Sequence, residues 1–143
     1  MPERAERALR ACTELLRRKD VDSVREVLSS LAEIAPPGVE WGVEVVSVAG
    51  TRYLVGGGTV TVVRVSRDEF GPFMRTQVAE VRPEDLPEEV MKVVLRDPEG
   101  FLRSVADQLE AWHSTGHGDK TLRAEVASFL EGLRSFLSGQ RDA

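Results

Sequence analysis

The apolar residues of this chain change their spacing twice, and that change constrains the fold more than any other feature. Before residue 39 and after residue 82 they recur every three or four positions, as on one face of an α-helix. Between these points they alternate, as in strands with one buried face. The sequence predicts one α+β domain over residues 1–143, with a helical pair at 1–38, an antiparallel sheet at 39–82 and a helical part at 83–143.

The helical parts contain clear start and stop signals. "RRKDVDS" separates two N-terminal apolar stripes, and Asp20 or Asp22 is suited to cap the second helix. "APPG" ends that helix, because proline cannot continue it. Three helices are predicted after residue 82, of which the second begins at Asp97 with Pro98 in the first helical position.

Four alternating segments predict the strands of the sheet, namely "VEWGVEVVSV", "RYLV", "TVTVVRVSR" and "FMRTQVAEV". Their connections are too short for parallel crossovers, so the sheet should be an antiparallel meander. The Val45-Val46 pair breaks the alternation, which indicates a bulge or a strand buried on both faces. Gly56, Gly57 and Gly58 precede strand formers and no Gly-Lys pair, so they predict a hairpin turn and not a phosphate-binding loop.

The last predicted helix, residues 119–139 with Asp119 as its cap, has a heptad-like apolar seam. The seam consists of Leu122, Val126, Phe129, Leu133 and Phe136. Such a seam is too short to prove a coiled coil. Two interpretations stay open: the helix packs on its own domain, or it forms the interface of a homodimer.

Charge and composition exclude several classes of protein. The net charge is −5, and residues 83–143 carry the whole deficit with seven basic and twelve acidic side chains. A uniform basic footprint for duplex DNA is therefore absent. The apolar runs are short and the first ten residues resemble no signal peptide, which predicts a cytoplasmic protein with no membrane partner. The absence of Asn and the small number of Gln, Cys and Met residues suggest a thermophilic source, and the excess of Arg, Val and Gly is equally compatible with a GC-rich genome.

No complete catalytic or metal motif is present, so we expect neither an enzyme nor a cofactor. His113, His117 and Asp119 lie within "HSTGHGD", but no further Cys or His is left to complete a site. The two glycines make this segment a flexible linker with solvated histidines. Cys12, the single cysteine, lies on the apolar stripe of its helix and is expected in the core.

The remaining constellation of residues is in the sheet. It combines Arg52, Arg64, Arg67, Arg75 and Arg82 with Trp41, Tyr53, Phe70 and Phe73. Arginine binds phosphate with a planar fork, and aromatic rings stack on bases. Alternatively, the rings form the core face of the sheet and the arginines pair with Glu40, Glu44, Asp68, Glu69 and Glu80. Strand register decides between these interpretations.

The predicted meander, its arginines and rings, the composition and the C-terminal seam resemble single-stranded DNA-binding proteins of the ThermoDBP type from hyperthermophilic archaea. The resemblance implies a sheet surrounded by helices, a binding cleft with basic edges, and oligomerisation through C-terminal helices. We therefore expect a non-catalytic, sequence-tolerant binder of single-stranded DNA or RNA that forms a homodimer. Trp41, Tyr53 and Phe73 would stack on bases, and Arg52, Arg64, Arg67 and Arg75 would hold phosphates. The rival is a protein-interaction or regulatory module without affinity for nucleic acid.

Overall fold

The computed structural model describes residues 3–36, 42–48, 50–67 and 74–141. Two helices are followed by a sheet and then by further helices, as predicted. The helices are α1 (Glu3–Arg18), α2 (Val21–Ile34), α4 (Glu88–Leu95), α5 (Pro98–Ser114) and α6 (Lys120–Arg141), with a short 3₁₀ turn η1 (Pro83–Asp85). The strands are β1 (Val43–Val48), β2 (Thr51–Gly56), β3 (Thr59–Arg67) and β4 (Met74–Val81).

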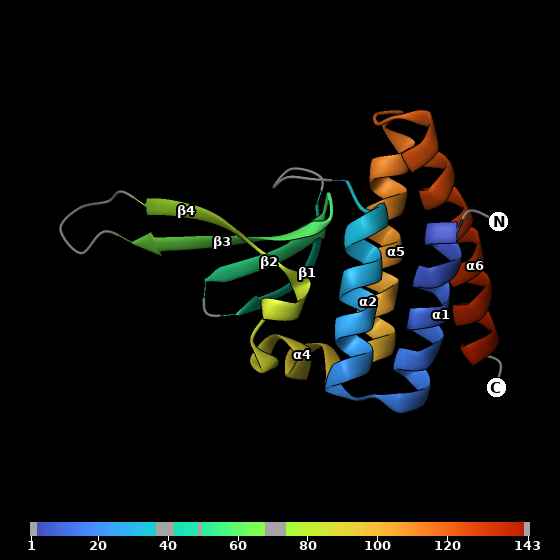
Figure 1. The fold of residues 1–143 in the computed structure, drawn as a ribbon, viewed down its shortest axis with the longest axis horizontal. Helices are drawn as coiled ribbons and strands as arrows, with labels where there is room; N and C mark the ends of the chain where they lie inside the picture. Colours follow the sequence, from blue (N-terminus) through green and yellow to red (C-terminus); the bar gives the residue numbers. More distant parts are fainter. Residues whose placement is uncertain (1–2, 37–41, 49, 68–73, 142–143) are drawn as a thin grey trace.

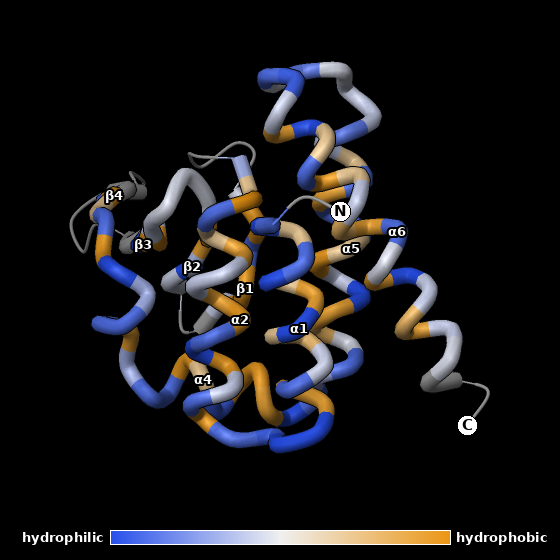
Figure 2. The backbone as a smooth tube through the Cα atoms, turned by 45° about the vertical axis from the view of Figure 1, so that its right-hand side comes forward, coloured by the Kyte–Doolittle hydropathy of each residue, from blue (hydrophilic) through white to orange (hydrophobic). Residues whose placement is uncertain are grey.

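The helices form a bundle on one side of the molecule, and the sheet packs against it. Figure 1 shows α1, α2, α5 and α6 side by side. The sheet lies against α2 and α5, on the side that faces away from α1 and α6. In Figure 2 the apolar segments of these helices lie mainly where the elements face one another. One continuous core joins the bundle to the sheet, and it includes the fully buried Leu28, Leu109 and Val55.

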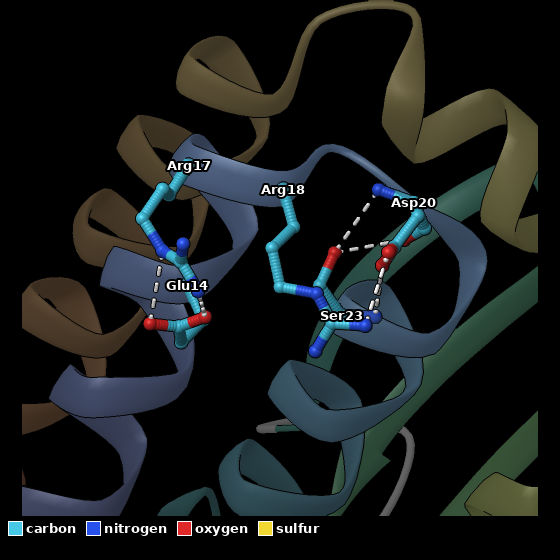
Figure 3. Close-up of polar contacts among 5 residues, drawn as sticks. All are labelled: Glu14, Arg17, Arg18, Asp20 and Ser23. Atoms are coloured by element: carbon cyan, nitrogen blue, oxygen red, sulfur yellow. Dashed lines mark hydrogen bonds and ion pairs between the residues drawn. The ribbon is translucent and has the colours of Figure 1, made fainter.

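Asp20, one of the two capping residues that the sequence predicted, caps the start of α2, and two reciprocal hydrogen bonds form the cap. The Asp20 carboxylate accepts the backbone N–H of Ser23 at 2.8 Å, and the Ser23 hydroxyl accepts the backbone N–H of Asp20 at 3.2 Å (Figure 3). Lys19, just before, has a φ of 51° and turns the chain between the two helices. This capping box satisfies N–H groups that have no partner within the helix.

The predicted caps of the last two helices are confirmed. The Asp97 carboxylate accepts the N–H of Gly100 at 3.0 Å, and Pro98 occupies the first turn of α5. The Asp119 carboxylate accepts the N–H of Leu122 at 2.7 Å. No helix in the described ranges is long and apolar enough to span a membrane.

The sheet is the expected antiparallel meander in the order β1-β2-β3-β4. Its register shifts between Glu44 and Val46, where β1 pairs with β2, which confirms the irregularity indicated by the Val45-Val46 pair. Directly paired residues share a face of the sheet. We call the face that contains Val43, Val55 and Val60 the inner face, because these residues belong to the core shared with the helices.

The apolar seam of α6 lies inside the molecule. Val126, Phe129 and Leu133 are 0% exposed and belong to the common core, while Leu122 and Phe136 are half-buried at its margin. The helix packs against α1 and α5. In the single chain α6 therefore packs on its own domain, which is the first of the two interpretations left open by the sequence. A dimer through this seam would require α6 to leave the core.

Candidate nucleic-acid interface

The three glycines form a hairpin turn, as predicted, and that turn also closes the end of α2. Gly57 and Gly58 have φ values of 61° and 81°, the left-handed conformation of a two-residue hairpin loop. The N–H of Gly57 donates to the carbonyl of Ala35 at 3.0 Å, and the N–H of Gly58 donates to that of Ala32 at 2.7 Å. Both N–H groups are thus bonded to the C-terminal end of α2 and are not available to a phosphate.

The register separates the sheet arginines between two faces. Arg52 is paired with Val63 and lies on the outer face, whereas Arg64 is paired with Thr51 and lies on the inner face. The position of Arg75, paired with Ser66, is also on the inner face, and that of Arg67 is on the outer face. The five arginines of the prediction therefore do not form one continuous surface.

Two of these arginines have carboxylate partners. Arg52 on the outer face donates to Glu44 of β1 at 2.5 Å, which is the pairing that the alternative interpretation anticipated. Arg82 lies 3.8 Å from Glu84 and 3.6 Å from Asp85, with 78% of its side chain exposed. Such partners reduce the local positive charge available to a nucleic acid.

Tyr53 is the one predicted stacking residue within the described ranges, and it is half-buried on the inner face. It packs against the common core and is paired with Val62 of β3. Trp41, Phe70 and Phe73 lie outside the described residues.

β3 and β4 extend beyond the other two strands as a two-stranded ribbon. The pairing of β2 with β3 ends at Thr51 and Arg64, while β3 continues to pair with β4 as far as Arg67 and Met74. In Figure 1 this end of the hairpin projects away from the helices. We define the ribbon as residues 64–67 and 74–77.

The charge of the ribbon differs from that of the chain as a whole. Its eight residues include Arg64, Arg67 and Arg75 and no carboxylate, in a chain of net charge −5. The segment 68–73 that connects its strands contains Asp68 and Glu69. Arg64 is exposed and forms no ion pair with any other residue in the part of the chain that the structure describes.

Three positions of the inner face form a diagonal line that runs toward the ribbon. Tyr53 is a diagonal neighbour of Arg64, because Arg64 pairs with Thr51 two residues away. Arg64 is in turn a diagonal neighbour of Arg75, because Arg64 pairs with Gln77. Diagonal neighbours across antiparallel strands are about 7–8 Å apart, within reach of long side chains. The positions of Tyr53, Arg64 and Arg75 thus lie along one face of the sheet.

The sequence offered two other candidate sites, a metal site at residues 113–119 and the thiol of Cys12. Within the described residues, no group of three His, Cys, Asp or Glu side chains is arranged to hold a metal ion. The carboxylate of Asp119 is used as the cap of α6. Cys12 is fully buried, and this burial raises the pKa of its thiol to about 12, so the nucleophilic thiolate is strongly disfavoured.

Comparison with known proteins adds no relative. No protein-family model matches the chain, and no curated protein and no solved structure matches it significantly. The diagonal line of Tyr53, Arg64 and Arg75 is therefore assessed on its geometry and charge alone.

Sequence reasoning named the residues of this line but missed the ribbon. A signal was present, because "TVTVVRVSR" is nine residues long and the preceding "RYLV" is only four. A strand that is longer than its neighbour on one side must continue without it, and it leaves a two-stranded extension.

Proposed function

We propose that this protein is a non-catalytic binder of single-stranded nucleic acid, DNA or RNA, with little preference for sequence. The observation that carries the proposal is the ribbon, whose eight residues hold three arginines and no carboxylate in an otherwise acidic chain. Phosphate contacts supply most of the affinity of sequence-tolerant binding, and arginine is suited to them.

The roles follow from the positions on the inner face. Arg64 and Arg75 hold successive phosphates, and the exposed part of the Tyr53 ring stacks on a base beside them. Arg67 lies on the other face of the ribbon and contributes to the general positive potential. Arg52 and Arg82 contribute less, because Glu44 and the Glu84–Asp85 pair offset their charges.

The resemblance to ThermoDBP-type proteins supports this proposal only through the antiparallel sheet, because it implies a sheet surrounded by helices and here the helical bundle lies on one side of the sheet. The resemblance concerns the arrangement of elements and the arginine and aromatic content of the sheet. The rival function, a protein-interaction or regulatory module, requires no affinity of the ribbon for phosphate.

A salt series with fluorescently labelled oligo-dT tests the proposal. If Arg64 and Arg75 each neutralise one phosphate and Arg67 contributes a similar amount through its potential, the logarithm of the association constant should fall with log salt at a slope of about −2. Arg64→Ala with Arg75→Ala should weaken binding at low salt and reduce the slope to about −0.7.

The matched control is Arg10→Ala with Arg17→Ala. It removes the same charge from exposed positions of α1, on the far side of the helices from the ribbon (Figure 1). This control should bind almost as the unmodified protein does. The proposal is wrong if no oligonucleotide binds at low salt, or if the control loses as much affinity as the ribbon variant. The first of these outcomes would favour the rival function.

A further inference from the structure

One edge of the sheet has no pairing partner among the described residues. β4 is the last strand in the order β1-β2-β3-β4, and Gln77, Val78, Ala79 and Glu80 are all exposed. Val78 is 57% exposed, more than any other large apolar side chain that the structure describes. β4 contains no proline, no glycine and no register shift. Soluble proteins usually protect such an edge with proline, a bulge or charged side chains. β4 has charged residues only toward its two ends, at Arg75 and Glu80, so the stretch around Val78 is suited to pair with another strand.

The pairing pattern shows which backbone groups point out of this edge. A two-residue hairpin closes on a hydrogen-bonded pair, here Gly56 with Thr59, and bonded pairs then alternate along the strands. Val60, Val62 and Arg64 therefore direct their N–H and C=O groups toward β4. Thr76, Val78 and Glu80 direct theirs outward.

An independent hydrogen bond agrees with this assignment. The hydroxyl of Thr59 donates to the carbonyl of Val81 at 2.9 Å, so this carbonyl faces β3 and not the free edge. Val81 and Val78 are an odd number of residues apart, which places the backbone groups of Val78 on the opposite side of the strand.

The two ends of β4 have opposite charge. Its beginning lies in the ribbon, which contains three arginines and no carboxylate. Its end is followed by exposed acidic residues that outnumber the single Arg82, namely Glu84, Asp85, Glu88 and Glu89. A strand with a basic beginning and an acidic continuation is complementary to a second copy of itself in antiparallel orientation.

We propose that β4 pairs with β4 of a second copy of this chain, antiparallel and centred on Val78, to form a homodimer with a continuous eight-stranded sheet. In this register Val78 faces Val78 of the second copy, and Thr76 faces Glu80. The outward-pointing N–H and C=O groups of Thr76, Val78 and Glu80 in one copy then form hydrogen bonds with those of the other copy. The basic ribbon of one copy lies beside the acidic segment that follows β4 in the other copy, and two-fold symmetry repeats the contact.

This dimer uses a different surface from the apolar seam of α6, which is buried within the single chain. It also goes beyond the proposed binding of nucleic acid and does not rest on it, although both use the ribbon and the acidic segment of the second copy would compete with phosphate there. Oligomeric state is measured without any oligonucleotide, so the two proposals fail separately.

Light scattering coupled to size-exclusion chromatography tests the dimer, with the dissociation constant obtained by sedimentation equilibrium. The unmodified chain should be a dimer at micromolar concentration. Val78→Lys places two like charges on the two-fold axis and should raise the dissociation constant at least about tenfold. Val78→Thr keeps a β-branched side chain without charge, and it should remain a dimer.

A proline variant tests the backbone bonds directly. Val78→Pro removes an N–H that points outward, so it should abolish the dimer while the hydrogen bonds between β3 and β4 remain. Circular dichroism should confirm that this variant is folded. Ala79→Pro, in contrast, removes an N–H that is bonded to β3, and it should lower the melting temperature.

Two double variants test how much the acidic residues after β4 contribute to the stability of the dimer. Glu88→Gln with Glu89→Gln should weaken the dimer several-fold, whereas Glu3→Gln with Glu6→Gln on α1 should leave the dissociation constant unchanged. A monomer at all accessible concentrations overturns the proposal. So does a dimer that persists in both Val78→Lys and Val78→Pro.

Discussion

The helical bundle differs from the end of the sheet that contains the ribbon and the adjacent Val78 in how far it buries side chains of the same kind. In the bundle, large apolar residues such as Phe129 and Leu133 are completely buried. On β4, Val78 is 57% exposed, and Arg64 opposite Gln77 is exposed as well. The bundle and the sheet residues packed on it therefore supply the hydrophobic free energy of folding, and the exposed Val78 contributes little to it. A segment that is not needed for the core is available for binding.

Arginines show the same contrast. Several arginines of the bundle pair with carboxylates, as in Arg7 with Glu33 at 2.8 Å and Arg134 with Asp107 at 3.0 Å. Arg64 of the ribbon has no such partner among the described residues. Exposed ion pairs add little to stability but they do cancel charge. The paired arginines of the bundle thus have their charges offset, while Arg64 keeps its positive charge among the described residues.

The largest expected effect comes from emptying the core of the bundle. Phe129→Ala should lower the free energy of unfolding by about 3–5 kcal/mol, because it leaves a cavity among fully buried side chains. Arg64→Ala, the matched change in the ribbon, should alter it by less than about 0.5 kcal/mol. Urea denaturation measures both. Similar losses in the two variants would contradict the division between a stabilising bundle and a free ribbon.

A smaller effect is expected where the two regions meet, at the glycine turn. A Cβ added at Gly56 would lie 1.9 Å from the carbonyl oxygen of Pro36, so Gly56→Ala should cost about 2–3 kcal/mol as the backbone shifts. A Cβ at Gly58 meets nothing within 4 Å. Gly58→Ala should cost only about 1–2 kcal/mol, from its positive φ. Chemical denaturation that ranks Gly58→Ala as the more harmful change would show that close packing of α2 on the turn is unimportant.

The smallest effect concerns the acid dependence of the bundle, at Asp20. The backbone N–H and hydroxyl of Ser23 hold the pKa of this carboxyl below its ordinary value, with Arg18 adding to the effect (Figure 3). A pKa that is lowered on folding stabilises the folded state above the unfolded pKa, and this contribution is lost as the pH falls through the folded value.

Thermal unfolding of Asp20→Asn across the acidic range measures this contribution. Asparagine can still cap the helix but does not titrate. The unmodified protein should have the higher melting temperature near neutral pH, and the difference should shrink below the ordinary pKa range of aspartate. Asp22→Asn removes a carboxylate from the same turn of α2 that is not the cap, and the difference should change less with pH. A difference that stays constant for Asp20→Asn would contradict the link between this carboxylate and stability.

Much of the fold could be predicted because its signals are local. The spacing of apolar residues identified each α-helix and strand of the described ranges, and Asp97 with Pro98 marked the start of α5. The irregularity at Val45-Val46 and the turn at the glycines were also readable, since each depends on a few adjacent residues.

The candidate site could be predicted only in part. Its residue types were apparent, but a shift of one residue in register moves a side chain to the other face of a sheet. Nothing local indicated that Arg52 would lie on the outer face beside Glu44, or that Arg64 would lie on the inner face near Tyr53. Likewise, the seam of α6 has the same pattern whether its partner is α1 of the same chain or a helix of another copy.

The sequence by itself determined the kind, order and approximate ends of the helices and strands, because periodicity, capping residues and turn glycines act over a few positions. The tertiary structure alone decided which arginines share a face, which of them are paired with carboxylates, and that Phe129 points into the chain's own core. These outcomes depend on contacts between segments that are distant in sequence. Their free energies are summed over the whole chain, so no short stretch of residues encodes them.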